Sequence, residues 1–256
     1  MVKLLIYFGE ILKYVIKPLP ITRVKTDKSV MTYLLNFSTP LEIGTFAWAI
    51  EGDGRRFLVD TGCSAGMQTS SGFPAEQIYT IDEALKSIGW TSKSVDAVIL
   101  THLHLDHFAY VEKFRDVDIF VQRKEYAAAV NPHPSYRHLY NSDFIKNLFS
   151  SLNVKFVDGD EEIADGLSLL FTPGHTPGGQ SILVETEKGV AAITGFCCIK
   201  ENFEPPPSLK DIFKFIVPGI HINIESLYES MLKVEEAADI IIPIHDKSFF
   251  NVKSIP

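Results

Sequence analysis

The chain has 256 residues, of which 46% are hydrophobic and 22% charged, so it is long enough to bury one large core or two small ones. Its formal net charge is -8 and it has no lysine- or arginine-rich run, which argues against binding along a nucleic-acid backbone, because such binding needs clustered positive charge. Its three cysteines, Cys63, Cys197 and Cys198, do not form a disulfide framework and favour reduced thiols in a cytoplasm.

The first twenty residues, "MVKLLIYFGEILKYVIKPLP", are apolar but interrupted by charges. A spanning helix needs about 20 nearly uncharged residues, so we expect no stable membrane insertion. The apolar side chains instead fall on one helical stripe, formed by Leu5, Phe8, Leu12 and Val15. We therefore predict a helix over about residues 1–17, packed on its own domain or on a second subunit as a homodimer, with attachment to a membrane surface as the alternative.

Short apolar runs alternate with helical patterns along the rest of the chain. The runs that read as buried strands are 55–60, 96–101, 118–122, 167–172, 190–195 and 239–244. The segments that read as helices are 81–89, 108–114 and 224–238. A proline-rich, partly apolar segment at about 203–223 reads as a long surface connection that forms a lid over the site. We expect an α/β fold in one domain, 1–256.

Metal-ligand residue types follow four of these predicted strands. "VILT" precedes His102, "LLFTPG" precedes His175, "AAITG" precedes Cys197 and "IIIPI" precedes His245. Loops at the carboxyl ends of strands converge above a rigid sheet edge, where ligands usually bind in α/β folds. Four chain segments are therefore predicted to bring such side chains to one edge.

The stretch "HLHLDH", residues 102–107, is the densest of these groups. Residues two apart share a side of an extended chain but not of a helix, so His102 and His104 bind one metal only from an extended loop. Asp106 and His107 then begin the helix 108–114 and face a second metal. The alternative is a polar turn in which these residues cap a helix.

Three motifs, "THLHLDH" (101–107), "TPGHTPGGQS" (172–181) and "PIHD" (243–246), resemble the metallo-β-lactamase superfamily. The resemblance implies a four-layer αβ/βα sandwich with metals at one edge. The second motif and the later "KENFE" (200–204) are most similar to the N-acyl-homoserine lactonase branch. The implied first metal ligands are His102, His104 and His175. The implied second set is Asp106, His107 and His245, with Asp60 of "VDTG" as an outer support.

The chain departs from that branch where the branch has a bridging aspartate and a tyrosine. Gly195 or Phe196 stands at the aspartate position, depending on the alignment, and Cys198 stands at the tyrosine position. "GFCCIK" also resembles "GGCLxK" of zinc β-lactamases, which makes Cys197 a candidate ligand of the second metal, with Cys198 the alternative. Free cysteines are often only small buried hydrophobes, so packing remains open for both.

The resemblance predicts a metal-dependent hydrolase that cleaves a small carbonyl substrate, a lactone, ester or amide. Two divalent ions are expected, zinc first, with iron or manganese as alternatives. A divalent ion lowers the pKa of its bound water, so that hydroxide attacks the carbonyl while Asp106 shuttles the proton. His221, within the predicted lid, is the second catalytic candidate, whereas His133 and His138 read as surface residues. The alternatives are a mononuclear-iron oxygenase or persulfide-type enzyme and a non-catalytic metal- or ligand-binding protein.

Overall fold

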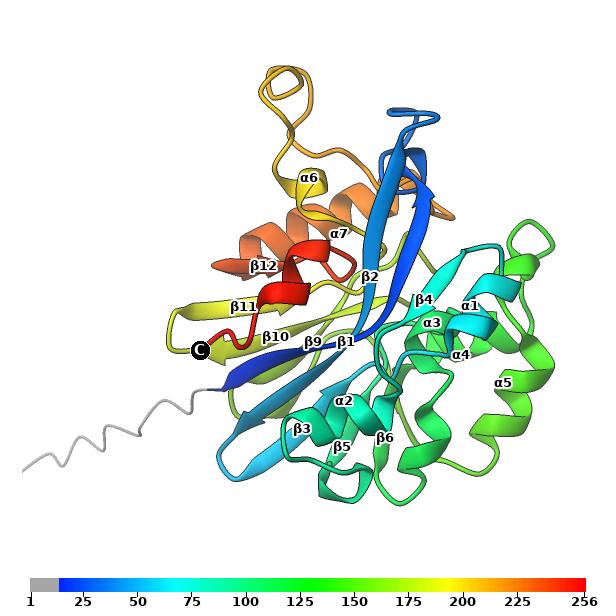
Figure 1. The fold of residues 1–256 in the computed structure, drawn as a ribbon, viewed down its shortest axis with the longest axis vertical. Helices are drawn as coiled ribbons and strands as arrows, with labels where there is room; N and C mark the ends of the chain where they lie inside the picture. The colour runs from blue at the N-terminus through cyan, green and yellow to red at the C-terminus, as the bar shows by residue number, and fades with distance from the viewer. Residues whose placement is uncertain (1–13) are drawn as a thin grey trace, which may run out of the picture.

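Two β-sheets pack face to face in the computed structural model, which describes residues 14–256 (Figure 1). The first sheet has strand order β4-β1-β2-β3-β5-β6-β7, with bounds β1 Val15–Asp27, β2 Pro40–Gly52, β3 Arg55–Val59, β4 Ala75–Gln77, β5 Ala97–Ile99, β6 Asp118–Gln122 and β7 Asn153–Val157. The second has order β12-β11-β10-β9-β8, with bounds β8 Glu161–Ala164, β9 Leu167–Phe171, β10 Gln180–Thr186, β11 Gly189–Ile193 and β12 Ile240–Ile242.

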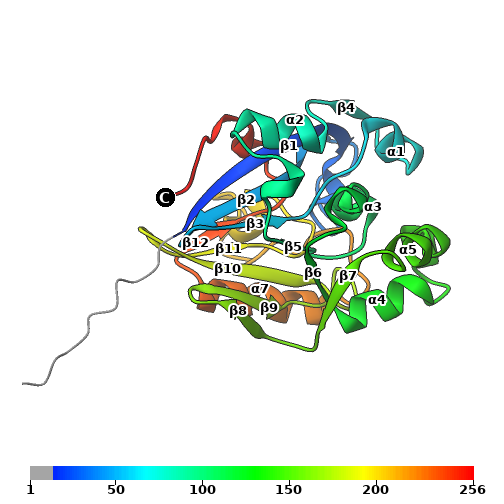
Figure 2. The ribbon, with the colours of Figure 1, turned by 90° about the horizontal axis from the view of Figure 1, so that it is seen from below.

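Helices cover the outer faces of both sheets, with α2 and α7 on opposite sides of the pair (Figure 2). The α-helices are α1 Ala65–Ser70, α2 Ile81–Ser87, α3 Leu105–Phe108, α4 Arg123–Val130, α5 Ser142–Phe149, α6 Lys200–Phe203 and α7 Ile224–Ala237. Short 3₁₀ helices span Lys28–Val30, Ser92–Ser94, Val111–Phe114, Arg137–Leu139 and Lys247–Asn251. The predicted helices at 81–89 and 224–238 correspond to α2 and α7, whereas the predicted helix 108–114 is wrong as one element, because α3 ends at Phe108 and a separate 3₁₀ helix follows.

Alternating side chains of the strands build the layers. In β5, Ala97 and Ile99 face the core between the sheets, and Val98 faces the core under the helices of the first sheet. In β11, Ile193 faces the core between the sheets, and Ala192 faces α7. Successive side chains of a strand point to opposite faces, so strands buried on both faces read as continuous apolar runs. The predicted four-layer αβ/βα sandwich is confirmed.

The two longest strands, β1 and β2, pair antiparallel in the first sheet and were not predicted. The predicted helix over about 1–17 lies mostly outside the described residues, and its last part is wrong because β1 begins at Val15. Pro18 and Pro20 interrupt the apolar pattern of β1. Both prolines lie outside the short ladder with β4, which spans only Thr22–Val24, and an open strand edge tolerates their missing N–H groups.

The carboxyl ends of the central strands meet at one edge of the sandwich. Strands β3, β5, β6 and β7 run parallel, as do β11 and β12. Parallel strands present their carboxyl ends together, so the loops that follow them converge. Among residues 14–256, no helix combines the length and apolar character that crossing a membrane requires.

Candidate metal centre

His102 and His104 leave the end of β5 on an extended loop, as predicted. His104 has extended backbone angles (φ -73°, ψ 147°) and is the residue that precedes α3. Leu103, between them, is fully buried in the core under the helices of the first sheet. Because alternate residues of an extended chain face opposite sides, burying Leu103 turns both imidazoles the other way, toward the site.

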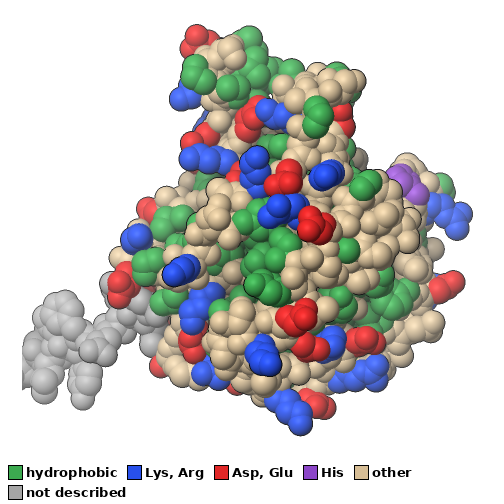
Figure 3. Space-filling view, in the orientation of Figure 1, with side chains coloured by type: hydrophobic (Ala, Val, Ile, Leu, Met, Phe, Trp, Pro, Cys, Tyr) green, Lys and Arg blue, Asp and Glu red, His purple; other side chains and the backbone are tan. Residues whose placement is uncertain are grey.

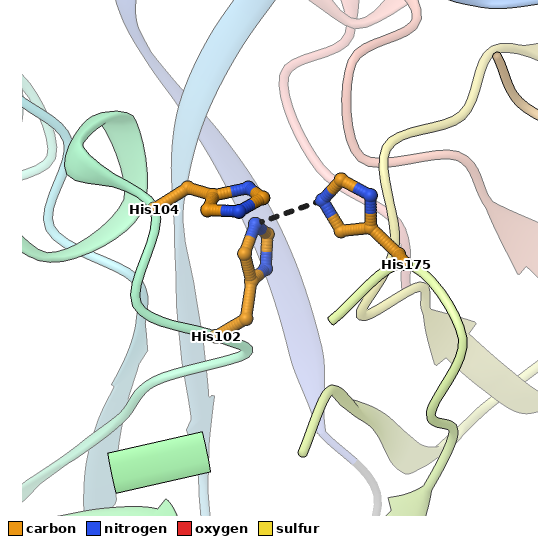
Figure 4. Close-up of side chains that lie close together, drawn as sticks. All are labelled: His102, His104 and His175. Atoms are coloured by element: carbon orange, nitrogen blue, oxygen red, sulfur yellow. Dashed lines mark hydrogen bonds between the residues drawn. The ribbon is translucent and has the colours of Figure 1, made fainter. Parts of the chain in front are cut away.

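His102, His104 and His175 form one group whose ligand atoms lie within 4.8 Å of one another. Figure 4 shows the three rings pointing toward a common centre, with Nε2 of His102 3.2 Å from Nε2 of His175. His175 Nδ1 donates to the carbonyl of Ile220 at 2.7 Å, which leaves the lone pair on Nε2. His175 is therefore held ready to bind a cation.

The Nε2 lone pair of His102 is fixed by a similar contact. Its Nδ1 donates to Thr101 Oγ1 at 3.0 Å, since that hydroxyl itself donates to Asp60 Oδ2 at 2.8 Å. Two lone pairs therefore face each other across 3.2 Å, between His102 and His175. Two acceptors this close repel unless a proton or a cation lies between them, so the donor set fits a metal ion.

Asp106, His107 and His245 form a second group, whose ligand atoms also lie within 4.8 Å of one another. His107 Nδ1 donates to Asp60 Oδ2 at 2.7 Å, and His245 Nδ1 donates to the carbonyl of Gly44 at 2.8 Å. Each Nε2 again carries the lone pair, and His107 Nε2 is 3.5 Å from Asp106 Oδ2. The structure thus assembles both predicted sets of three ligands.

Asp60 is the carboxylate that connects the two groups. It is fully buried and accepts from the Thr101 N–H at 2.8 Å, from the Thr101 hydroxyl and from His107. Its φ of 56° is in the left-handed region, which few non-glycine residues adopt and which is often seen at functional sites. This geometry matches the supporting role that the resemblance implies, because an outer carboxylate fixes the tautomer of a ligand histidine.

Burial keeps most of these imidazoles neutral. It lowers the pKa of His102 and of His175 well below the usual value, and lowers the pKa of His104 to about 4. Burial also lowers the pKa of His245. Burial acts the same way on His107, but Asp106 and Asp60 outweigh it and raise the pKa of that residue. Neutral imidazoles are the form that binds metals.

Two further groups bear on the fit. His104 Nε2 is buried and has no hydrogen-bond partner within the described part of the chain. A buried polar atom without a partner is destabilising, and a metal ion bound to this nitrogen would satisfy it. Burial raises the pKa of Asp106, but His107, His245 and His104 outweigh it and the net pKa is lowered. A carboxylate thus remains ionised beside the second group. Imidazole and carboxylate donors in this number fit divalent ions.

The backbone after β11 leaves no room for an aspartate at the position where the resemblance leads us to expect one. A Cβ on Gly195 would lie 1.9 Å from the carbonyl oxygen of Gln180, so that position has no room for a side chain. Phe196 is fully buried, with its ring 6.1 Å from that of Phe203. Neither position presents a side chain to the metal groups, so no carboxylate in either place would bridge them with this backbone.

Cys197 lines the same cavity as both ligand groups, but it is not a member of either. Its thiol lies 3.5 Å from the sulfur of Met31, and burial raises its pKa well above the usual value. Cys198 lies outside that wall, bonded to Thr194 Oγ1 at 3.1 Å, and burial raises its pKa to about 12. Ligation by Cys197 stays a prediction, and the placement favours it over Cys198.

The predicted lid reaches the cavity only through Ile220, among the residues of 203–223. His221 lies outside the cavity wall. Its Nδ1 donates to the carbonyl of Pro218 at 2.9 Å, and its ring centroid lies 4.7 Å from that of Tyr33. Phe215 is buried under α7. The tip of the segment protrudes beside the loop before β2, and Figure 3 shows hydrophobic side chains on both protrusions. We therefore do not assign His221 a catalytic role.

The rest of the cavity wall is mainly apolar. Its apolar side chains are Val24, Val30, Met31, Ile43, Phe73, Leu105, Leu139 and Ile220. His138, expected on the surface, is exposed yet also lines the cavity, because the 3₁₀ helix Arg137–Leu139 turns it toward the mouth. No sequence signal pointed to His138, since no strand end precedes it. The supports Thr101, Ile220 and Gly44 were also not predicted, because they act through a backbone carbonyl or a common hydroxyl.

Comparison with known proteins agrees with this geometry. The family model described as the metallo-beta-lactamase superfamily matches residues 42–195. N-acyl homoserine lactonase from Bacillus cereus is 33% identical over 202 residues, covering 72% of this chain and 76% of that protein. N-acyl homoserine lactonase AiiB from Agrobacterium fabrum is 26% identical over 219 residues, with coverage of 73% and 79%.

A solved structure extends the match to nearly the whole chain. It is an N-acyl homoserine lactone hydrolase with the product N-hexanoyl-L-homoserine at its catalytic metal centre. Its TM-score is 0.76 at 28% identity, covering 93% of this chain and 95% of that one. Family model, relative and fold agree with the two groups of ligands at the sheet edge. This chain belongs to the metallo-beta-lactamase superfamily and is a metal-dependent hydrolase of that superfamily.

Proposed function

We propose that this enzyme hydrolyses the ring ester of a lactone that carries an apolar substituent, using two divalent ions, zinc first. The observation that carries the proposal is the assembly of both ligand groups on one cavity whose remaining wall is mainly apolar. Relatives of the chain are N-acyl homoserine lactonases, which supports a lactone ahead of a simple ester or amide. A single-metal enzyme is less well supported, because Asp106, His107 and His245 form a second group that could hold a metal ion.

Two bound divalent ions would supply an activated water and a Lewis acid for the carbonyl oxygen. The first would be held by His102, His104 and His175, and the second by Asp106, His107 and His245. The chain supplies the geometry, since Asp60, Ile220 and Gly44 fix the Nδ1 atoms and so aim the opposite nitrogens at the cavity.

Asp106 is placed to handle the proton. Its side chain is 24% exposed, on the cavity side, while the neighbouring His107 is 2% exposed. Against the effect of burial, the neighbouring histidines lower the pKa of Asp106, so its carboxylate is ionised at neutral pH. It would take up the proton of the attacking water and return it to the leaving alkoxide as the ring opens. Asp106 thus combines the roles of ligand and proton shuttle.

The position of the branch's tyrosine holds Cys198, whose thiol lies behind the cavity wall. A side chain that faces the substrate must come from elsewhere. His138 at the mouth is placed to contact an acyl amide or ring carbonyl, and Gln68 and Ser71 are further polar residues of the cavity wall. We expect His138→Ala to raise KM more than it lowers kcat, because His138 contacts substrate without touching either ligand group.

The test is turnover of the metal-loaded enzyme on matched substrates. The panel is a γ-lactone with a short or a long N-acyl chain, the corresponding open methyl ester, and the corresponding amide. We expect the highest kcat/KM for the long-chain lactone and loss of activity on chelation. Metal binding without turnover of any member would indicate a binding protein. Oxygen consumption with a single bound iron would indicate the oxygenase or persulfide-type alternative.

A further inference from the structure

The carboxylate of Glu125 joins three segments around the first ligand group. Glu125 is fully buried in the first turn of α4 and lies behind the cavity wall. Its Oε1 accepts from the N–H of Leu103 at 2.9 Å and from the hydroxyl of Tyr140 at 3.0 Å. Its Oε2 accepts from the N–H of Gly178 at 3.0 Å. All three hydrogen-bond donors come from different loops or elements.

The bond to Leu103 fixes the loop that carries two ligands. Leu103 is the residue between His102 and His104, so its amide direction sets the extended backbone that turns both rings to the same side (Figure 4). A buried N–H without an acceptor is destabilising, which opposes any rotation of this peptide. Glu125 therefore holds the spacing of the first two donors.

The bond to Gly178 fixes the loop that carries the third ligand. Gly178 follows His175 by three residues, and a Cβ on it would lie 2.1 Å from the backbone nitrogen of Glu125. The His175 loop therefore rests directly on the start of α4, with no side chain between them. One carboxylate thereby ties the His102–His104 loop and the His175 loop to the same helix.

The bond from Tyr140 adds a ring contact. Tyr140 is 8% exposed, and its ring centroid lies 5.4 Å from that of His104. Its hydroxyl donates to Glu125, so the ring is held beside His104. Burying a carboxylate is unfavourable unless donors surround it, and here three donors from the loops of the site do so.

We propose that Glu125 is a positioning residue of the metal centre, which sets the mutual geometry of His102, His104 and His175 through Leu103, Gly178 and Tyr140. The inference rests on the proposed function only in requiring that the centre binds metal. Its role is indirect, because Glu125 touches neither the cavity nor a ligand nitrogen.

Glu125→Gln keeps the shape but places an amide NH₂ where the partners Leu103, Gly178 and Tyr140 all donate. One segment then loses its acceptor, and we expect the affinity for Zn²⁺ to fall about 10- to 100-fold, as loss of an outer hydrogen-bond partner usually does. The measurement is competition with a chromophoric chelator in the absence of substrate. The d–d absorption spectrum of the Co²⁺-loaded protein is the second measurement, because it reports ligand geometry and a purely structural role would leave it unchanged.

Tyr140→Phe and Tyr14→Phe form a matched pair of variants. Each removes the hydroxyl of a buried tyrosine, which donates one bond of 3.0 Å: Tyr140 to Glu125 and Tyr14, in a partly buried contact, to the carbonyl of Asp165. We expect both to lose similar stability, but only Tyr140→Phe to weaken Zn²⁺ and shift the Co²⁺ spectrum. If Glu125→Gln does not fold, this pair of variants still tests whether the hydrogen bonds of Glu125 position the metal centre.

Wild-type affinity and spectrum in folded Glu125→Gln would overturn the inference, as would equal Zn²⁺ affinity in the two tyrosine variants. A wild-type protein that binds Zn²⁺ but hydrolyses no member of the substrate panel would overturn the proposed function alone, since the affinity measurements need no turnover. A wild-type protein that binds no metal would overturn both.

Discussion

At the scale of single residues, the site depends on which nitrogen of each imidazole is free. His175, His107 and His245 all donate from Nδ1 to a carbonyl or carboxylate oxygen, so each presents Nε2 to the cavity. The acceptors are Ile220, Asp60 and Gly44, of which only Asp60 was suggested by a motif. The ligands were readable from the sequence because they have a chemical type, and the acceptors were not because a carbonyl belongs to every residue.

His104→Ala removes one of three donors from the first group. We expect a loss of bound metal and a loss of activity greater than about 100-fold, the upper end of what loss of an outer partner costs. Metal content by elemental analysis and kcat/KM are the measurements. His133→Ala is the control, because His133 is exposed and its Nδ1 contacts Ser135 at 2.8 Å. Full activity of chelated, metal-free protein would refute the hydrolase mechanism.

Cys197→Ser tests the predicted thiolate ligand. A thiolate there would supply the negative charge that Gly195 lacks, so we expect this substitution to weaken one of two metals selectively. Cys198→Ser is the matched control, because its thiol lies behind the cavity wall against Thr194, and it is expected to leave both affinities unchanged. If Cys197→Ser binds two metals as tightly as the wild type, the thiol serves only for packing against Met31.

At the scale of elements, the site depends on close backbone contacts between loops that follow strands. The loop after β9 rests on the N-terminus of α4 through Gly178, and on α7 through Gly174, whose φ is 124° and whose Cβ would lie 2.3 Å from the backbone nitrogen of Leu227. The glycines of "TPGHTPGGQS" are therefore needed for approach as well as for turning. The motif that carries His175 therefore also packs against the backbones of α4 and α7.

Gly178→Ala should push the His175 loop away from α4. The added Cβ would overlap the backbone of Glu125 at 2.1 Å, and such overpacking costs about 1–3 kcal/mol of unfolding free energy. We expect that loss together with weaker metal binding. Gly66→Ala is the control, since its nearest neighbour would be 3.9 Å away and it lies in α1, where alanine is favourable. Unfolding in urea and chelator competition measure the two effects.

Gly195→Asp places an aspartate at one of the two positions where the resemblance leads us to expect the bridging carboxylate. The new Cβ would lie 1.9 Å from the Gln180 carbonyl, so we expect a protein destabilised by more than about 3 kcal/mol or insoluble, rather than one with tighter metal binding. Soluble yield, urea unfolding and metal affinity are measured together. A stable variant with increased affinity would show that the strand end moves to admit the carboxylate.

At the scale of the whole molecule, metal binding and stability are coupled, because the ligands come from both sheets and converge only in the folded chain. Five segments meet at this edge, those around Asp60, His102, His175, Cys197 and His245. Removing metal should therefore lower Tm, as loss of any ligand that binds only the native state does.

The metal-free protein should lose stability as the pH falls. His102, His104, His175 and His245 have lowered pKa values, so between about pH 6.5 and about pH 4 the unfolded chain binds more protons than the folded one. His107 and Glu125, whose pKa values are raised, act in the opposite sense, but they are two residues against four.

The pKa of about 4 for His104 alone corresponds to a loss on the order of 2 kcal/mol of unfolding free energy by about pH 5. Urea unfolding of chelated protein at about pH 7.5 and about pH 5 measures this. His104→Gln should reduce the dependence, because it removes one of the groups that titrate. Constant or rising stability on acidification would contradict this account.

The sequence by itself indicated the sandwich, through its resemblance to the family, and named the six histidine and aspartate residues that the structure gathers into two groups able to hold metal ions. Buried strands leave apolar runs, and ligand types directly after such runs must lie at a sheet edge. The tertiary structure decided what depends on contacts between distant segments. Residues 15–17 form part of strand β1 and not of a helix. His221 lies outside the metal cavity, whereas His138 lines its wall. The Gln180 carbonyl leaves no room for a side chain at Gly195, and Glu125 is buried behind the two groups of possible ligands. These outcomes follow from which backbones approach one another, and local residue patterns carry no record of that approach.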